Sequence, residues 1–151
     1  MTLLQVAAFT SDFPDDMVED EHDIIQFGGK GVSEAIGAIL SGLGYSVGEL
    51  DYQGERGWEF SAGAEGQQIW LLLSDLGDYL MLQVEDPSFM GLRPKYRQFR
   101  EHFLSGLTDA LNRDGRFHDL LWFAAVGDPF GFPDPAGEGG RRPAPQAWRW
   151  S

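Results

Sequence analysis

The sequence contains no cysteine, and this absence removes several classes of protein at once. Disulfide scaffolds, thiolate zinc sites and thiol nucleophiles all require cysteine. A fold of 151 residues must therefore be held together by its hydrophobic core, which at this length buries about two-thirds of the surface of the unfolded chain. A chain without disulfides is compatible with a reducing compartment, and we expect a cytoplasmic protein.

Long apolar runs are also missing. No segment approaches the roughly 20 apolar residues that a membrane span requires. The first ten residues lack both the basic region and the apolar length of a signal peptide. The sequence therefore predicts a protein that does not enter a membrane.

Basic residues are scarce, because 11 Lys and Arg stand against 24 Asp and Glu, which gives a formal net charge of -13. Affinity for nucleic acid comes largely from the neutralisation of phosphates by Lys and Arg. A strongly acidic protein repels phosphate backbones through its overall field. The composition therefore argues against DNA and RNA as partners.

Residue patterns typical of catalysis are missing as well. The three histidines, His22, His102 and His118, have no spacing that would join them in a metal site. No serine lies in the Gly-x-Ser-x-Gly pattern of a nucleophile elbow. We therefore predict no catalytic residues, no metal site and no cofactor.

Acidic residues are concentrated in the first half of the chain, where residues 1–53 hold ten acids and a single base, Lys30. Seven of these acids form a dense run, namely Asp12, Asp15, Asp16, Glu19, Asp20, Glu21 and Asp23. A run that repels itself is expected in solvent, as a loop or frayed turn. It lacks the turn glycine and terminal glutamate of an EF-hand calcium loop. Because a carboxylate patch steers basic partners onto a protein, these seven residues are the predicted partner-binding residues.

Apolar spacings of three and four residues predict two helices, at about residues 32–43 and 94–113. Gly44 stands where the first helix would end in a left-handed cap. Pro94 suits the first turn of the second helix, and Gly115 ends it. In this second helix we assign the charged residues Arg97, Arg100 and Glu101 to the solvent side.

Four short runs lie between the helices, at residues 46–52, 57–62, 67–73 and 78–85, and glycine-containing turns separate them. Connections this short favour an antiparallel meander. The runs 67–73 and 78–85 are apolar on both faces, so the chain's own termini or another molecule must cover the second face. Residues 119–126 predict a final strand, and the first ten residues are a candidate for one more.

The order of these elements predicts an α+β fold, with an antiparallel sheet of about four to five strands and two helices packed on one face. Residues 1–126 form this single domain. Residues 127–151 form a Gly- and Pro-rich tail, because they hold too few aliphatic side chains to offset the entropy of ordering. Aromatic residues of the tail, including Phe130 and Trp148, are candidates to dock on a surface.

A glycine-rich loop precedes the first helix, and backbone N–H groups at a helix start beside a lysine can hold an anion. The phosphate-loop pattern fails, because Gly31 stands where Ser or Thr is required and Ile24 where the first glycine is required. An ordinary turn into the helix is the competing interpretation. Trp58 and Trp70 either belong to the core or line a cleft. The candidate ligand-binding residues are therefore Gly28, Gly29, Lys30, Gly31, Trp58 and Trp70.

Four segments carry a resemblance to a known group of proteins: Leu43-Gly44-Tyr45, Gly57-Trp58-Glu59-Phe60, Ile69-Trp70-Leu71 and Phe117-His118-Asp119-Leu120-Leu121-Trp122-Phe123. In this pattern, over about residues 31–124, the chain resembles the small acidic bacterial α+β proteins of unknown function among which many toxin-immunity proteins are found. The resemblance implies a protein that acts by binding and not by chemistry. It implies no catalytic residue.

Two hypotheses follow. The first is a non-enzymatic, immunity-like protein-binding module whose acidic run recognises a protein partner, either a basic protein or a second copy in a homodimer. The alternative is a small-molecule-binding domain or an enzyme, with a pocket between sheet and helices that uses the glycine loop or the tryptophans.

Overall fold

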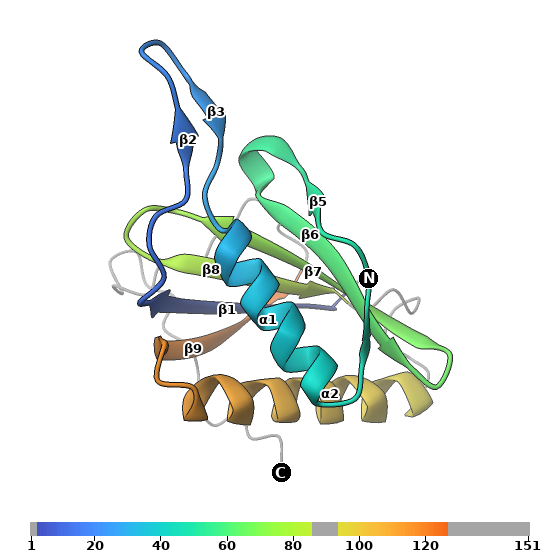
Figure 1. Cartoon of the computed structure of the whole chain (residues 1–151). Helices are drawn as coiled ribbons and strands as arrows, with labels where there is room; N and C mark the ends of the chain where they lie inside the picture. The colour runs from blue at the N-terminus through green and yellow to red at the C-terminus, as the bar shows by residue number, and fades with distance from the viewer. Residues whose placement is uncertain (1–2, 86–93, 127–151) are drawn as a thin grey trace.

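The structure is a computed structural model that describes residues 3–85 and 94–126 (Figure 1). The predicted tail, residues 127–151, lies outside the described residues. The elements in chain order are β1 (Leu3–Ser11), β2 (Val18–Glu19), β3 (Ile24–Gln26), α1 (Lys30–Gly42), β4 (Ser46–Val47), β5 (Asp51–Tyr52), η1 (Gly54–Arg56), β6 (Trp58–Ala64), β7 (Gln67–Asp75), β8 (Leu80–Glu85), α2 (Pro94–Arg113) and β9 (Phe117–Val126).

Among the described residues, the main sheet has seven strands in the order β4-β6-β7-β8-β1-β9, with β5 also paired to β6, and β2 and β3 form a separate two-stranded sheet. Every pair of neighbouring strands is antiparallel. The strand at the start of the chain is internal, because Val6 of β1 lies opposite Gln83 of β8 and Phe123 of β9. The part of the chain that the structure describes has two α-helices and an antiparallel sheet, so the fold is α+β.

The sequence predicted four to five strands, and that count was too low. One reason is that the predicted strand at 46–52 is two short pieces, β4 and β5, which both pair with β6. Between them the backbone N–H of Gly48 donates to the carbonyl of Ser61 at 2.8 Å, so the chain stays against β6 without continuous pairing. The meander β6-β7-β8 agrees with the prediction.

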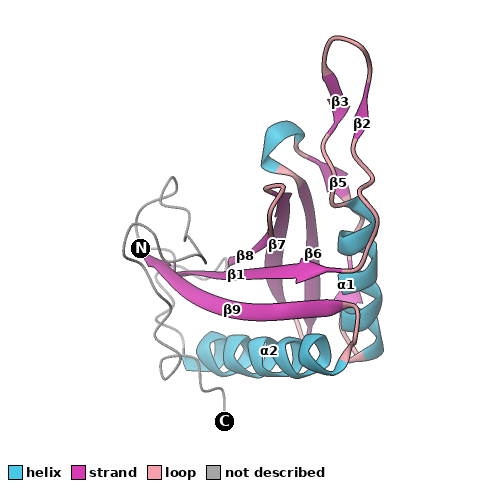
Figure 2. Cartoon of the chain, turned by 90° about the vertical axis from the view of Figure 1, so that its left-hand side faces the viewer, coloured by secondary structure: helices cyan, strands magenta, loops and turns pink. Residues whose placement is uncertain are grey.

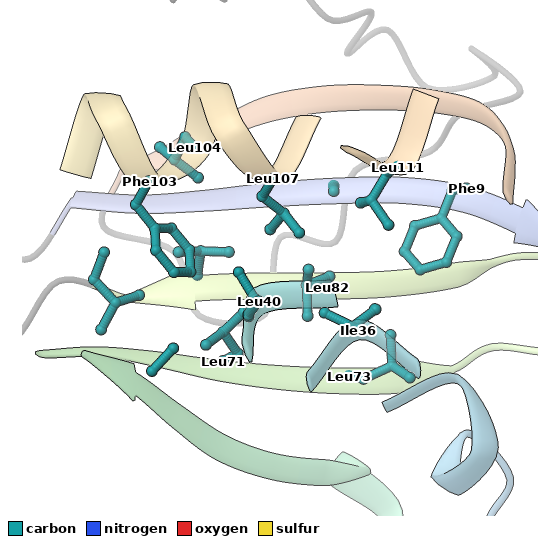
Figure 3. Packing of buried hydrophobic residues seen from close by; sticks show 14 of the residues in the cluster. Phe9, Ile36, Leu40, Leu71, Leu73, Leu82, Phe103, Leu104, Leu107 and Leu111 are labelled. Carbon is teal, nitrogen blue, oxygen red and sulfur yellow. The ribbon is translucent and has the colours of Figure 1, made fainter. Parts of the chain in front are cut away.

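The helices α1 and α2 contribute to the same hydrophobic core (Figure 3). Ile36 and Leu40 of α1 and Phe103 and Leu107 of α2 belong to one buried cluster together with strand residues such as Leu71. Leu73, two positions further along β7, belongs to it as well, as expected for one face of a strand. Both helices therefore cover the same face of the sheet.

The opposite face of the sheet also carries apolar side chains. Val6, Ala8 and Met81 form a second, smaller buried cluster there. Trp70 on β7 and Leu121 on β9 are 39% and 38% exposed. This explains why β7 and β8 lack a polar and apolar alternation in sequence, because both of their faces hold apolar residues.

One prediction about α2 was wrong. The sequence assigned Arg100 to the solvent side, but this side chain is buried, with 7% of its surface exposed. Arg100 stands at helical spacing from Leu104, Leu107 and Leu111, which are all buried. The spacing alone would have placed Arg100 in the buried stripe, and its charge led to the wrong assignment.

Gly57, at the start of β6, permits a close contact between two strands. Its φ of +112° lies in a region that side chains rarely adopt, and a Cβ at this position would overlap the carbonyl oxygen of Leu73. Gly54 has a positive φ of +63° as well, but a Cβ there would have no atom within 4 Å. Alanine substitutions at the two positions therefore distinguish the cost of backbone strain from the cost of steric overlap.

We expect Gly57→Ala to lower the free energy of unfolding by at least about 3 kcal/mol, because the strain of a left-handed backbone adds to an overlap that moves β7. Gly54→Ala is the matched control and should cost about 1 kcal/mol, from backbone strain alone. Urea unfolding followed by tryptophan fluorescence measures both values. Equal losses would contradict the close approach of Gly57 to Leu73.

Candidate functional site

The acidic run forms a β-hairpin that stands away from the rest of the molecule (Figures 1 and 2). The sequence predicted a loop or frayed turn, whereas β2 and β3 pair in antiparallel register, with Val18 opposite Gln26 and Glu19 opposite Ile24. All side chains from Val18 to Ile25 are exposed, as predicted for a run of like charges. We call residues 17–27 the acidic hairpin.

The tip of the acidic hairpin is folded by one of its own carboxylates. Asp20 accepts hydrogen bonds from the backbone N–H groups of His22 at 2.9 Å and of Asp23 at 2.8 Å. The backbone N–H of Asp20 in turn donates to the carbonyl of Asp23 at 2.9 Å. The two hydrogen bonds to its carboxylate hold the pKa of Asp20 below its usual value, so this group is ionised at neutral pH.

Three apolar side chains are exposed on the same hairpin, namely Val18, Ile24 and Ile25, and Ile25 has 59% of its surface exposed. These three residues were not among the candidates predicted from the sequence. A signal was present, because β-branched residues on both sides of a polar turn are typical of a hairpin. The hairpin therefore combines apolar side chains with the carboxylates of Glu19, Asp20, Glu21 and Asp23.

The base of the acidic hairpin is held by Asp16. Its Oδ1 accepts a hydrogen bond from the backbone N–H of Gly29 at 2.8 Å, and its Oδ2 accepts one from Gly31 at 2.7 Å. Gly29 and Gly31 stand at the start of α1, which has no side-chain cap of its own and no acidic residue in its first turn. Asp16 thus supplies the negative charge that favours a helix N-terminus.

Two aromatic residues hold the other strand of the hairpin. The backbone N–H of Phe27 donates to the hydroxyl of Tyr52 at 2.8 Å, and the indole N–H of Trp58 donates to the carbonyl of Phe27 at 3.3 Å. The rings of Tyr52 and Trp58 pack against each other with centroids 4.8 Å apart. Tyr52 was not among the predicted residues, because nothing in the sequence links it to a residue 25 positions away.

The glycine loop does hold an anion, and that anion is the side chain of Asp16. Gly28 is also surrounded by carboxylates, because a Cβ built on it would lie 2.6 Å from Oδ2 of Asp75 and 3.3 Å from Oδ1 of Asp15. A phosphate at this loop would meet these negative charges at short range. Lys30 instead lies over the ring of Trp58, with its Nζ 5.9 Å from the ring centroid.

The two predicted tryptophans lie on opposite faces of the sheet. Trp58 is buried and belongs to the hairpin base beside Gly29. Trp70 lies opposite Ser61 of β6, on the face away from the helices. The structure therefore brings the glycine loop and Trp58 together and leaves Trp70 apart, so the two rings do not line one cleft.

The seven predicted partner-binding acids divide into two groups. Glu19, Asp20, Glu21 and Asp23 lie at the exposed end of the acidic hairpin. Asp12, Asp15 and Asp16 lie at or before its base. Oδ1 of Asp12 lies 2.9 Å from Nε2 of His118 on β9, and Asp15 accepts a hydrogen bond from the backbone N–H of Met17 at 3.0 Å.

A cleft of about 220 Å³ lies at the hairpin base, between the end of β1, Gly29 and the turn from β7 to β8. Its lining includes Asp15, Asp16, Asp75 and Asp78 together with the ring of Phe13. Within residues 3–85 and 94–126, no three histidine, aspartate or glutamate side chains are grouped so that they could hold a metal ion. In the same part of the chain, no helix has both the length and the apolar character of a membrane span.

No protein-family model matches the chain, and no curated protein matches its sequence.

We expect Asp16→Asn to lower the free energy of unfolding by about 1–3 kcal/mol, because an amide has one acceptor oxygen for two backbone N–H groups and lacks the charge that favours a helix start. Asp15→Asn is the matched control, since among the described residues Asp15 accepts a hydrogen bond only from its near neighbour Met17, and its loss should change stability by less than about 0.5 kcal/mol. Urea unfolding measures both variants. A loss no larger for Asp16 than for Asp15 would show that Asp16 does not stabilise α1.

Proposed function

We propose that this protein is a non-enzymatic protein-binding module of the immunity-like kind, active in the cytoplasm, and that its acidic hairpin recognises a basic protein partner. One observation carries the proposal. A projecting hairpin exposes Val18, Ile24 and Ile25 beside four carboxylates, and its base and tip are held by specific hydrogen bonds.

The two kinds of side chain would contribute differently to binding. Apolar residues at the centre of an interface supply most of the affinity once water is excluded. Surrounding charges steer the encounter and select a partner of opposite charge. The complementary surface on the partner is therefore an apolar depression bordered by Lys and Arg.

The alternative of a small-molecule pocket has weaker support. The cleft at the hairpin base, at about 220 Å³, is smaller than the roughly 300–1,000 Å³ of typical ligand pockets. It lies at the end of the sheet, where Val32 of α1 approaches the ends of β1 and β8, and its lining includes four aspartates. A homodimer that pairs the second sheet faces, on which Trp70 and Leu121 are exposed, is a separate candidate. The affinity purification described next would recover it as the chain alone.

The partner is sought by affinity purification of the tagged chain from its native host at low and at high salt, with mass spectrometry of the bound proteins. We expect one basic protein, recovered in stoichiometric amount at low salt and reduced at high salt, because screening weakens attraction between exposed charges. Recovery of the chain alone would contradict the proposal. So would recovery of a partner whose affinity is unchanged by the hairpin substitutions described below.

Charge reversal by Glu19→Lys together with Glu21→Lys should weaken binding of the purified partner at least about tenfold at low salt and reduce its salt dependence. The control is Glu49→Lys together with Glu101→Lys, which makes the same change in net charge at two other exposed positions. Titration calorimetry at several salt concentrations measures all three proteins. Equal weakening in both double variants would assign the effect to net charge and not to the hairpin.

Substitution of Ile25 by serine should also weaken binding about tenfold, but without changing the salt dependence, because it removes apolar area and no charge. Leu43→Ser is the control, since Leu43 is exposed at the end of α1. The same calorimetry detects the difference. Unchanged affinity in Ile25→Ser would remove the apolar side chains from the proposed interface.

A further inference from the structure

Exposed apolar side chains gather at the end of the molecule from which the acidic hairpin projects. Eight large apolar side chains are exposed among the described residues, and five of them lie at this end, namely Val18, Ile24, Ile25, Tyr52 and Leu76. Tyr52 accepts the hydrogen bond from Phe27 at the hairpin base. Leu76 follows Asp75, whose Oδ2 reaches the backbone of Gly28 at the same base. Apolar surface gathered in one place is typical of a contact surface.

The cleft of about 220 Å³ opens at this hairpin base, and its walls are of two kinds. Phe13, Val32 and Leu80 form an apolar part of the lining. Carboxylates form much of the polar part, namely Asp15, Asp16, Asp75 and Asp78. A cleft below the usual size range for small ligands still has room for one amino-acid side chain. The lining therefore suits a side chain that is apolar along its stem and positive at its end.

The carboxylates of the cleft crowd together without a cation of their own. A Cβ built on Gly28 would lie within 3.3 Å of oxygen atoms of Asp15, Asp16 and Asp75. In residues 3–85 and 94–126, none of these three aspartates forms an ion pair with a lysine or arginine. Lys30 lies instead over the ring of Trp58. Because like charges repel at this range, a cation placed among them lowers the electrostatic energy of the site.

We propose that the cleft binds a basic side chain, arginine or lysine, supplied by the protein partner, and that Leu76 extends the interface of the acidic hairpin beside it. The stem of such a side chain packs along Phe13 and Leu80, while its charged end reaches the aspartates. Side chains that fill a pocket on the partner are typical anchors of protein interfaces, and arginine is frequent among them. The inference rests on the proposed function, because it takes the partner to be a basic protein.

A soluble probe tests the cleft without the partner. The isotopically labelled full chain is titrated in nuclear magnetic resonance experiments with N-acetylarginine amide, and with N-acetylcitrulline amide as the neutral control of the same shape. We expect saturable shifts of the backbone N–H signals of Gly29 and Gly77, which line the cleft, with a dissociation constant in the millimolar range. The citrulline compound should cause no such shifts, because it carries no charge to pair with the aspartates.

Asp78→Asn should weaken binding of the arginine probe at least about threefold, because it removes one carboxylate from the lining. Asp109→Asn is the matched control, since it removes the same charge from an exposed position on α2. Equal shifts with the citrulline compound, shifts confined to the hairpin tip, or no saturable shift at Gly29 and Gly77 would overturn the proposed cation site. So would equal weakening in the two variants.

The purified partner provides the second measurement. Leu76→Ser and Asp78→Asn should each weaken its binding at least about threefold, whereas Leu43→Ser, which alters a similarly exposed leucine on α1, should not. A partner whose affinity depends on Ile25 but on neither Leu76 nor Asp78 would overturn this inference and leave the proposed function standing. Probe binding at the cleft with no protein recovered from the host would support the cation site and reject the proposed function.

Discussion

The two hydrogen bonds from Gly29 and Gly31 to the carboxylate of Asp16 determine how the base of the acidic hairpin is built. They give α1 the negative charge at its start that its own residues do not supply. They also join residue 16 to residue 29, the two sides of the base from which the acidic hairpin projects (Figure 1). Ile36 of α1 is fully buried in the core, so α1 is fixed against the sheet. Because Asp16 bonds to the start of α1, the same carboxylate also fixes the hairpin relative to the sheet.

Much of the fold could be predicted from the sequence, because most elements are long enough to show a period. The amphipathic pattern of α2 predicted its bounds, and glycine-containing turns predicted the meander β6-β7-β8. Strands β2 and β3 are only two and three residues long, so no period distinguishes them from a loop. Arg100 was misplaced because its residue type was given more weight than its spacing.

The candidate site was predicted only in part. The run of acids and its exposure follow from composition, since like charges repel and remain in solvent. The roles within the run do not, because Asp16 bonds to residues 13 and 15 positions away and Tyr52 to one 25 positions away. Such contacts depend on the tertiary fold. The sequence indicated that the glycine loop could bind an anion. It did not indicate that the side chain of Asp16 would be that anion, because no spacing pattern links residue 16 to the loop.

The arrangement of charges argues for recognition and not for solubility alone. An isolated two-stranded hairpin is marginally stable in water, so short strands such as β2 and β3 depend on their anchors. Asp16, Tyr52 and Trp58 hold the base, and Asp20 holds the tip. A solubilising run of acids requires no such anchors and gains nothing from an exposed Ile25. A hairpin held in one conformation loses less entropy on binding, which is the advantage that a recognition element obtains from these hydrogen bonds.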